Sequence, residues 1–215
     1  MTAWKLTTIV LLALWASNFK PAFAQPQLDT GLYLGGGYGF GKAGVRTDGI
    51  AAALQRNGFT TVTTSADESS EGWKLFAGYQ FHRNIAFEAG YADLGKFSAF
   101  AVTIPAGTTR QTYNSTGWGA DLIAIWPFGN GFSIYGRGGV LFSETRTNIV
   151  NTGAVRSRTS EAKNSDVGYK LGMGLGYDFT RNWRVRGEWE RYNVANIGDG
   201  HANVDFFSVS LLYKF

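Results

Sequence analysis

Hydrophobic and polar positions alternate along most of the chain after residue 25, in runs of about ten residues separated by turns or polar segments. In the run TGWGADLIAIW, for example, Trp118, Leu122 and Trp126 share one face, opposite Gly119 and Asp121. Alternation with a period of two is typical of a β-strand whose two faces meet different surroundings. There are eight such runs, at residues 30–41, 71–81, 85–94, 116–126, 132–142, 167–179, 182–192 and 204–215. They predict an all-β chain of eight antiparallel strands.

The two faces of these runs differ in a way that a soluble protein would not need. One face is apolar with aromatic residues near the strand ends, and the other holds glycine and charge. A soluble β-sandwich has no need of so many glycines on its polar face. Trp and Tyr near strand ends match the aromatic girdles of outer-membrane barrels, and the runs are long enough for strands that cross a bilayer. We therefore expect an eight-stranded transmembrane up-and-down β-barrel in the cell outer membrane.

The connections between the runs alternate between short and long. FHRN, PFGNG and DFTRN are tight turns, whereas residues 44–70, 93–115, 144–166 and 193–203 are long and polar. Barrels of this class have short periplasmic turns and long extracellular loops. We therefore expect both chain termini in the periplasm and the four loops at the cell surface. The segment GIAAALQRNGF in the first loop is predicted to form a short helix.

The first 24 residues have the pattern of a secretory signal. Lys5 precedes the apolar stretch LTTIVLLALWA, which is too short to span a bilayer, and residues 22–24 (AFA) form a small-x-small cleavage site. We expect a cleaved signal peptide at 1–24 and a barrel domain at 25–215. Without Lys5 and Lys20, the 20 basic residues become 18 against 16 acidic ones, a balance too close to neutral to indicate a nucleic-acid partner. There is no cysteine, and therefore neither a disulfide nor a site for lipid attachment through cysteine.

Charged residues on the glycine-rich faces should point into the barrel. An eight-stranded barrel is just wide enough for side chains to fill, so we expect a packed polar core rather than an open channel. Buried charges are costly unless they are paired, which predicts a network of ion pairs across the lumen. Its members would be Lys74, Glu88, Asp121, Arg137, Lys170, Arg186, Glu188 and Glu190. Two interpretations stay open: a structural plug that fixes strand register, and a gated, narrow ion path.

The tight turns predict which residues face each other across the hairpins. A turn centred on Arg83 pairs Gly78 with Glu88 and Phe76 with Gly90, and a turn centred on Gly129 pairs Asp121 with Arg137. A turn centred on Thr180 pairs Gly176, Gly174, Gly172 and Lys170 with Arg184, Arg186, Glu188 and Glu190, in that order. Large or charged groups would then lie opposite glycines.

The remaining motifs indicate no catalytic, cofactor or metal site. The glycines of GFGKAG (39–44) match a dinucleotide-binding fingerprint, but that motif opens a helix, whereas here it ends a strand. His82 and His201 fall at opposite ends of the barrel, which argues against a metal site and against the Ser/His/acid site of lipid-modifying barrel enzymes. The loop cations Arg146, Arg156, Arg158 and Lys163 either contact lipopolysaccharide phosphates or are simply solvated.

Five segments carry a further indication: YLGGGYGFG, GYQFHRNIAFEAGYADLG, YGRGGVLF, GLGYDFTRNWRVRGEWERY and the terminal SLLYKF. Together they resemble the eight-stranded OmpA-like transmembrane domain, in the small single-domain form of opacity-type surface proteins, over residues 28–215. The resemblance implies that Tyr213 and Phe215 form the signal read by the barrel assembly machinery. It also implies that the family's inward charge cluster corresponds to Glu88, Arg137, Arg186 and Glu188. Because the chain ends at its eighth run, we expect no peptidoglycan-binding domain.

The sequence therefore predicts a non-enzymatic integral outer-membrane protein without a cofactor, which contributes to envelope integrity or to surface interactions through its loops. A narrow, porin-like pore is the second interpretation, and a lipid A-modifying barrel enzyme is the third. The expected partners are outer-membrane lipid and lipopolysaccharide, the barrel assembly machinery during biogenesis, and a host or surface ligand held by the loops.

Overall fold

A computed structural model describes residues 30–44, 52, 54–155, 158–194 and 202–215 of the chain. The predicted signal peptide at 1–24, Arg156 and His201 lie outside the described residues. In the described part, no helix is long and apolar enough to cross a membrane.

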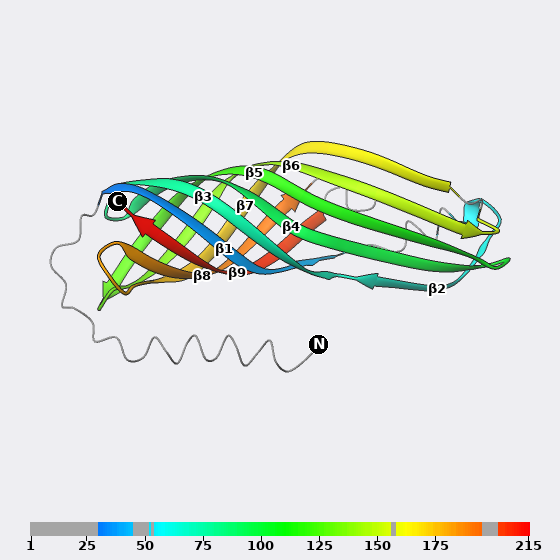
Figure 1. The fold of residues 1–215 in the computed structure, drawn as a ribbon, viewed down its shortest axis with the longest axis horizontal. Helices are drawn as coiled ribbons and strands as arrows, with labels where there is room; N and C mark the ends of the chain where they lie inside the picture. Colours follow the sequence, from blue (N-terminus) through cyan, green and yellow to red (C-terminus); the bar gives the residue numbers. More distant parts are fainter. Residues whose placement is uncertain (1–29, 45–51, 53, 156–157, 195–201) are drawn as a thin grey trace.

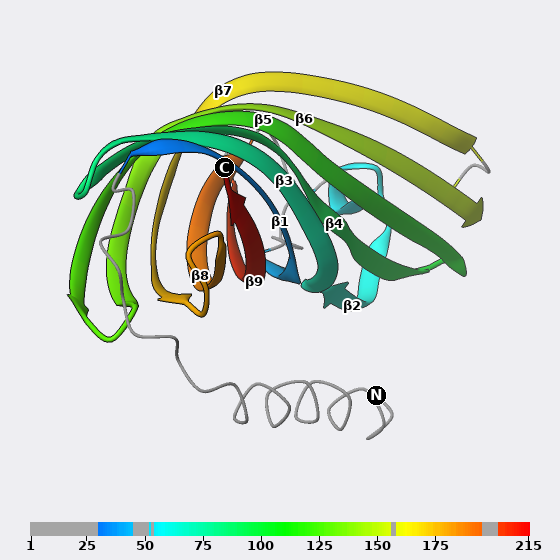
Figure 2. The ribbon, with the colours of Figure 1, turned by 60° about the vertical axis from the view of Figure 1, so that its left-hand side comes forward.

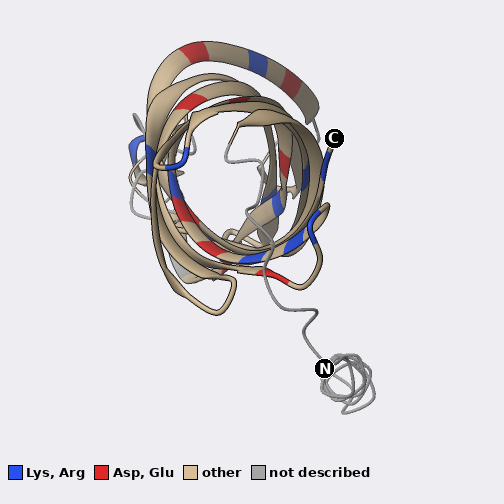
Figure 3. Ribbon diagram, turned by 90° about the vertical axis from the view of Figure 1, so that its left-hand side faces the viewer, with Lys and Arg blue, Asp and Glu red and all other residues tan. Residues whose placement is uncertain are grey.

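The described residues form nine antiparallel strands in one sheet (Figure 1). They are β1 (Gly31–Ala43), β2 (Thr60–Asp67), β3 (Ser69–His82), β4 (Ile85–Ile104), β5 (Gly107–Gly129), β6 (Phe132–Gly153), β7 (Arg158–Asp178), β8 (Trp183–Val194) and β9 (Ala202–Lys214). Strand β1 pairs with both β3 and β9, and β4 pairs with both β3 and β5, so eight strands close into a ring (Figures 2 and 3). The predicted eight-stranded barrel is confirmed.

Strand β2 is an addition that falls within the predicted first loop. It leads into β3 past Glu68 and pairs only with β4, where Asp67 lies opposite Ser98 and Thr60 opposite Ile104. The predicted short helix in the same loop is present as helical backbone at residues 52 and 54–56.

The outer face of the barrel carries a continuous apolar band. On β5, Trp118, Leu122 and Trp126 are 65%, 60% and 73% exposed. Beyond Trp118 the outward positions of the strand become polar, beginning with Thr116 and Asn114. Other strands repeat the pattern with exposed Leu34, Phe40, Leu75, Phe87, Ile134, Phe142, Leu171, Leu175, Phe207 and Val209. A band of this kind is stable only where hydrocarbon covers it.

One of the predicted registers is confirmed and two are wrong by two residues. Gly78 lies opposite Glu88, as the turn at Arg83 predicted. In the last tight turn, Gly176 pairs with Arg186 rather than with Arg184. The reason is that the Thr180 hydroxyl accepts a 2.9 Å hydrogen bond from the Trp183 amide, in a turn centred on residue 181.

The other register error lies in the hairpin between β5 and β6. Asp121 faces Gly139, and Arg137 faces Ile123. Gly129, Asn130 and Gly131 all have positive φ angles (106°, 49° and 83°), so the turn is centred on Asn130 instead of Gly129.

Two of the predicted loops are largely strands. Residues 93–115 and 144–166, predicted as polar loops, are mostly continuations of β4, β5, β6 and β7, which extend past the apolar band (Figure 1). A bulge between Asp93 and Lys96 contains Gly95, whose φ is 89°, and it shifts the inward positions of β4 from even to odd residues. Because the alternation of inward and outward residues shifts by one position at this bulge, the sequence pattern did not predict the second half of β4.

Candidate functional site: a charged layer across the barrel

The inside of the barrel is crossed by a layer of charged side chains at mid-height. Its eight members are the residues predicted for the lumen network, and each has 7% or less of its surface exposed. They come from six strands: Lys74 on β3, Glu88 on β4, Asp121 on β5, Arg137 on β6, Lys170 on β7, and Arg186, Glu188 and Glu190 on β8. Figure 3, which looks along the barrel, shows basic and acidic positions around the ring. We call this set the charged layer.

Arg137 is the centre of the charged layer. Its Nη2 donates to Glu88 Oε2 at 2.7 Å and to Asp121 Oδ2 at 2.5 Å. Its Nη1 donates to Glu188 Oε1 at 3.0 Å and lies 3.2 Å from Glu190 Oε1. One guanidinium thus holds carboxylates from three different strands, a task that suits its planar fork of donors.

The other three cations surround this centre. Lys74 Nζ lies 2.6 Å from Glu188 Oε2 and also donates to Glu190, while Lys170 Nζ lies 2.6 Å from Asp121 Oδ2. Arg186 Nη1 donates to Glu88 Oε1 at 2.5 Å. Neutral groups complete the network: the Tyr33 hydroxyl donates to Glu88 at 2.9 Å, and the Ser210 hydroxyl donates to Glu188 at 2.7 Å.

The charged layer is electrically balanced. It contains four basic side chains and four acidic ones, and each carboxylate lies within ion-pair distance of at least one cation. Burying a charge without a counter-charge costs roughly several kcal/mol. Eight charges can therefore be buried together inside the barrel only if positive and negative charges pair with each other. The formal charges of the layer therefore sum to zero.

Glycines provide the space that these large side chains occupy. Gly139 lies directly opposite Asp121, and a Cβ there would collide with the Ala120 carbonyl oxygen and the Asp121 carboxylate. Outward-facing Gly136, on the same strand, has no comparable neighbour. The glycines on the polar faces thus follow from the width of a barrel filled by Arg, Lys, Glu and Asp.

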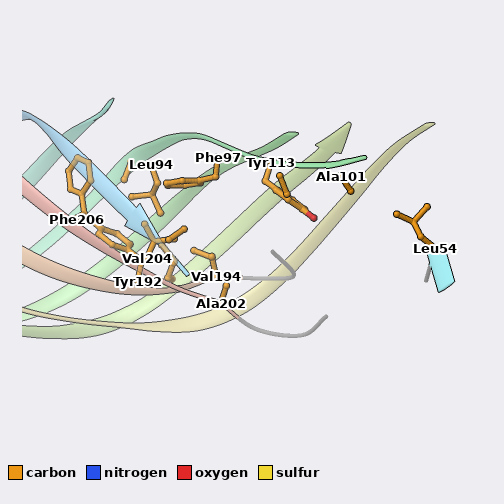
Figure 4. Packing of buried hydrophobic residues seen from close by; sticks show 14 residues of the cluster. Leu54, Leu94, Phe97, Ala101, Tyr113, Tyr192, Val194, Ala202, Val204 and Phe206 are labelled. Atoms are coloured by element: carbon orange, nitrogen blue, oxygen red, sulfur yellow. The ribbon is translucent and has the colours of Figure 1, made fainter. Parts of the chain in front are cut away.

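The predicted packed polar core is only one layer of the interior, because apolar clusters lie on both sides of the charged layer. Toward the tight turns, the cluster contains Tyr33, Phe76, Ala86, Ile123, Ile125, Tyr135 and Leu212. Toward the long connections, a larger cluster includes Leu94, Phe97, Tyr192, Val204 and Phe206 (Figure 4). In the sequence, Phe206 and Leu212 fall on the same inward face as Ser208 and Ser210, and this was the pattern from which apolar residues inside the barrel could have been predicted.

The two residues of the predicted assembly signal lie at the tight-turn end of the barrel. The ring of Tyr213 is 5.1 Å from that of Phe215 and 4.9 Å from that of Trp183. Phe215 is 60% exposed. The terminal residue is therefore accessible, next to two other aromatic rings.

Two of the four predicted loop cations lie directly opposite each other. Arg146 on β6 pairs with Lys163 on β7, and Glu144 bridges them, with its oxygens 3.0 Å from Arg146 Nε and 2.8 Å from Lys163 Nζ. These contacts, above all the hydrogen bond from Lys163, hold the pKa of the Glu144 carboxyl below its ordinary value. The side chain of Arg158 lies outside the described residues, as does Arg156.

Within the described ranges, no three His, Cys, Asp or Glu side chains are grouped so that they could hold a metal ion. His82 is the last residue of β3, and its Nδ1 accepts a 3.3 Å hydrogen bond from the Asn84 amide.

Comparison with known proteins gives a family and a fold. Residues 7–215 match the family described as the outer membrane protein β-barrel domain. Neisserial surface protein A is similar in structure with a TM-score of 0.51 at 13% identity, over 86% of this chain and 97% of that one. OprG from Pseudomonas aeruginosa has a TM-score of 0.52 at 14% identity, over 86% of this chain and 96% of that one. No curated protein matches the chain.

These solved structures are too distant in sequence to indicate more than the fold, but the family match covers the whole described barrel. The resemblance to OmpA-like eight-stranded barrels is confirmed. The chain belongs to the family of outer-membrane proteins with a β-barrel domain, and its place is the cell outer membrane.

Proposed function

We propose that this outer-membrane barrel is closed and non-enzymatic, and that it contributes to envelope integrity or to surface interactions through its extracellular end. The observation that carries the proposal is the charged layer. Its buried, balanced side chains span the lumen between two apolar clusters, so an ion would have to break several short ion pairs to pass.

The orientation belongs to the same proposal. The tight turns and both ends of the barrel-forming chain face the periplasm, and the extensions of β4, β5, β6 and β7 face the cell exterior. Each of these four strands continues for about ten residues beyond the apolar band, which corresponds to a length of roughly 30 Å. This length supports a raised surface on which a host or surface ligand can bind.

Lipopolysaccharide and the assembly machinery are the proposed partners at the two ends of the barrel. Arg146 and Lys163 lie two outward positions beyond the band residues Phe142 and Val167, a depth that suits contact with lipid phosphates. The exposed Phe215 beside Tyr213 suits recognition of the last strand during assembly.

Conductance in planar bilayers tests the closed lumen. The purified barrel should give no stable conductance of porin size, whereas a porin inserted under the same conditions should. A stable conductance of porin size from the wild-type chain would overturn the proposal. Incubation with lipid A followed by mass spectrometry tests the non-enzymatic part, because an altered acyl pattern would show a lipid-modifying activity.

A narrow ion path remains the second candidate. A cavity lies between the charged layer and the cluster toward the long connections, lined in part by Lys74, Asp121, Arg137 and Tyr192. Asp121 Oδ1 and Arg137 Nε are buried there without hydrogen-bond partners, an arrangement that favours water inside the lumen. Small currents that are lost when Asp121 is replaced by Asn would favour this candidate over a closed plug.

A further inference from the structure

The outer part of β7 is the open edge of a sheet. One side of this strand pairs with β6 as far as Arg158, but the other side pairs with β8 only from Lys170 onward. Strands β8 and β9 end at the rim of the barrel, where Val194 lies opposite Ala202. Within the described ranges, no strand therefore pairs with that side of β7 before Lys170 (Figures 1 and 2). Such an edge presents backbone donors and acceptors to an added strand.

The edge is too long for the neighbouring connection to cover. The seven residues that join the paired ends of β8 and β9 leave from and return to one place, so they reach at most about 13 Å from it. Gly168 lies beside Asn193, near the end of β8, and Ala162 lies about 20 Å farther along β7. The side chains at positions 161–167 are exposed on both faces of the strand.

The sequence of this edge is complementary to itself. In an antiparallel pair of two copies centred on Ala162, residues equally far from Ala162 lie opposite each other on the same face. Glu161 of each copy then faces Lys163 of the other, and Lys163 is 57% exposed even though it contacts Glu144. The flanking positions match in the same way: Ser160 with Asn164, Thr159 with Ser165, and Arg158 with Asp166.

The charges of the edge select this partner and this register. Charged side chains on an edge strand normally prevent pairing with other strands. A register centred on Glu161 or on Lys163 would bring two like charges directly opposite each other, which is unfavourable. The register centred on Ala162 instead forms two pairs of opposite charge, one on each side of the centre.

We propose that this edge binds the same edge of a second copy of the chain, in a facing membrane. The outer part of β7 runs along the length of the barrel (Figure 1), so an antiparallel copy is inverted and belongs to a second membrane. Ala162 lies about 17 Å beyond the band residue Val167, which places the two apolar bands about 35 Å apart. The extended strands of each copy then occupy the space above β8, β9 and β1 of the other, which end at the rim. This contact names a partner for the proposed function and rests on its orientation of the barrel.

Clustering of phosphatidylcholine vesicles that carry the full barrel, followed by light scattering, tests the charge pairs. Wild-type vesicles should cluster. Glu161→Lys and Lys163→Glu should each slow clustering by about tenfold or more, because each variant places like charges opposite each other at many contacts at once. A mixture of vesicles with one variant and vesicles with the other should cluster like the wild type, since every Lys then faces a Glu. Arg110→Glu, exposed on β5 away from the edge, is the matched control and should change nothing.

Disulfide formation measures the register, because the chain has no cysteine of its own. Ala162→Cys should form a disulfide between chains from vesicles that carry different tags. Ser160→Cys mixed with Asn164→Cys should do the same. Asn164→Cys alone should not, because its two copies would lie about 13 Å apart along the strands, beyond the reach of a disulfide.

The outcomes separate the contact from the orientation on which it rests. A membrane-impermeant maleimide should label the Ala162→Cys thiol in intact cells. Absence of labelling would overturn the orientation and with it the contact between membranes. Labelling without clustering of wild-type vesicles would overturn the contact alone. Unchanged clustering in both charge variants, or a mixture that clusters no faster than either variant, would overturn the pairing of Glu161 with Lys163.

Discussion

Replacing Arg137 with Met is the most direct test of the charged layer. Methionine occupies a similar length of the lumen but carries no charge, so the layer would change from four cations and four anions to three cations and four anions. Glu88 and Asp121 would lose a partner at 2.7 Å and 2.5 Å, and Glu188 would lose one at 3.0 Å. At least one carboxylate would then be buried without a full counter-charge.

The size of the effect follows from the burial of the group. The side chain of Arg137 is 2% exposed, so its ion pairs are not screened by water. Removing one partner of a buried ion pair costs about 3–5 kcal/mol, because the remaining charge stays buried. At about 1.4 kcal/mol per tenfold, the unfolding equilibrium constant should rise by about 150-fold to about 4,000-fold.

Equilibrium unfolding by urea in phosphatidylcholine vesicles measures this change, with tryptophan fluorescence and the heat-dependent shift on a gel as signals. Arg83→Met is the matched control, because Arg83 lies exposed in the turn between β3 and β4 and should change stability by less than about 0.5 kcal/mol. The double variant Arg137→Met with Asp121→Asn restores the balance of charge. It should be more stable than the single variant.

Two results would refute the reasoning. If Arg137→Met unfolds with the wild-type free energy, the charged layer does not stabilise the closed barrel. If the double variant is no more stable than the single one, charge balance is not the reason for the loss.

Three further predictions concern packing, assembly and a surface carboxylate. Gly139→Ala should destabilise the barrel by about 1–3 kcal/mol in the same urea assay, because the new Cβ would collide with the Ala120 carbonyl oxygen on the neighbouring strand. The control Gly136→Ala should change the free energy of unfolding by less than about 0.5 kcal/mol. Equal values for the two variants would refute the steric argument. Phe215→Ala should slow the appearance of folded protein in cells, followed by pulse-chase, while the refolded barrel keeps its stability in vitro; unchanged assembly in cells would remove Phe215 from the signal. The Glu144 carboxyl, followed by carbon NMR, should titrate below its ordinary pKa, and Lys163→Met should raise the titration midpoint. Because the pKa of this carboxyl is lowered in the folded state, any stability that its ionised form contributes is lost as the pH falls through that pKa. An unchanged midpoint in Lys163→Met would contradict the bridge between Glu144 and Lys163.

The strand pattern and the outward face could be predicted because both follow from local chemistry. Alternation along β5 depends only on the residues of that strand, and a lipid-facing position must be apolar wherever it lies on the wall. The pairing of Gly78 with Glu88 was predictable from the short turn at Arg83, whereas the one-residue irregularity between Gln80 and His82, beside that turn, was not.

The wrong registers and the missed inward residues come from turns and bulges, which a strict alternation of polar and apolar residues does not reveal. Three residues with positive φ moved the centre of the turn at Asn130 by one position, which displaced the pairing by two. The bulge at Gly95 changed the inward phase of β4, so Phe97 was missed as an inward residue. Likewise, the sequence places Arg186 inside the barrel. It does not show that Nε and Nη2 of Arg186 have no hydrogen-bond partner, because this depends on the positions of Glu88 and Glu188 in three dimensions.

The charged layer also has a consequence for how the barrel folds. Its ion pairs join distant parts of the chain: Lys74 and Glu190 are 116 residues apart, and Glu88 and Arg186 are 98 apart. Strands β1–β5 contribute one cation and two anions, while β6–β9 contribute three cations and two anions. The two halves are joined by the β5–β6 hairpin, where Arg137 meets Asp121 only 16 residues away, so this pair can form before the sheet closes. The pairs Lys74–Glu190 and Glu88–Arg186 need strands from both halves of the chain, and the entropy of closing such long loops favours their formation late, as the ring of strands closes.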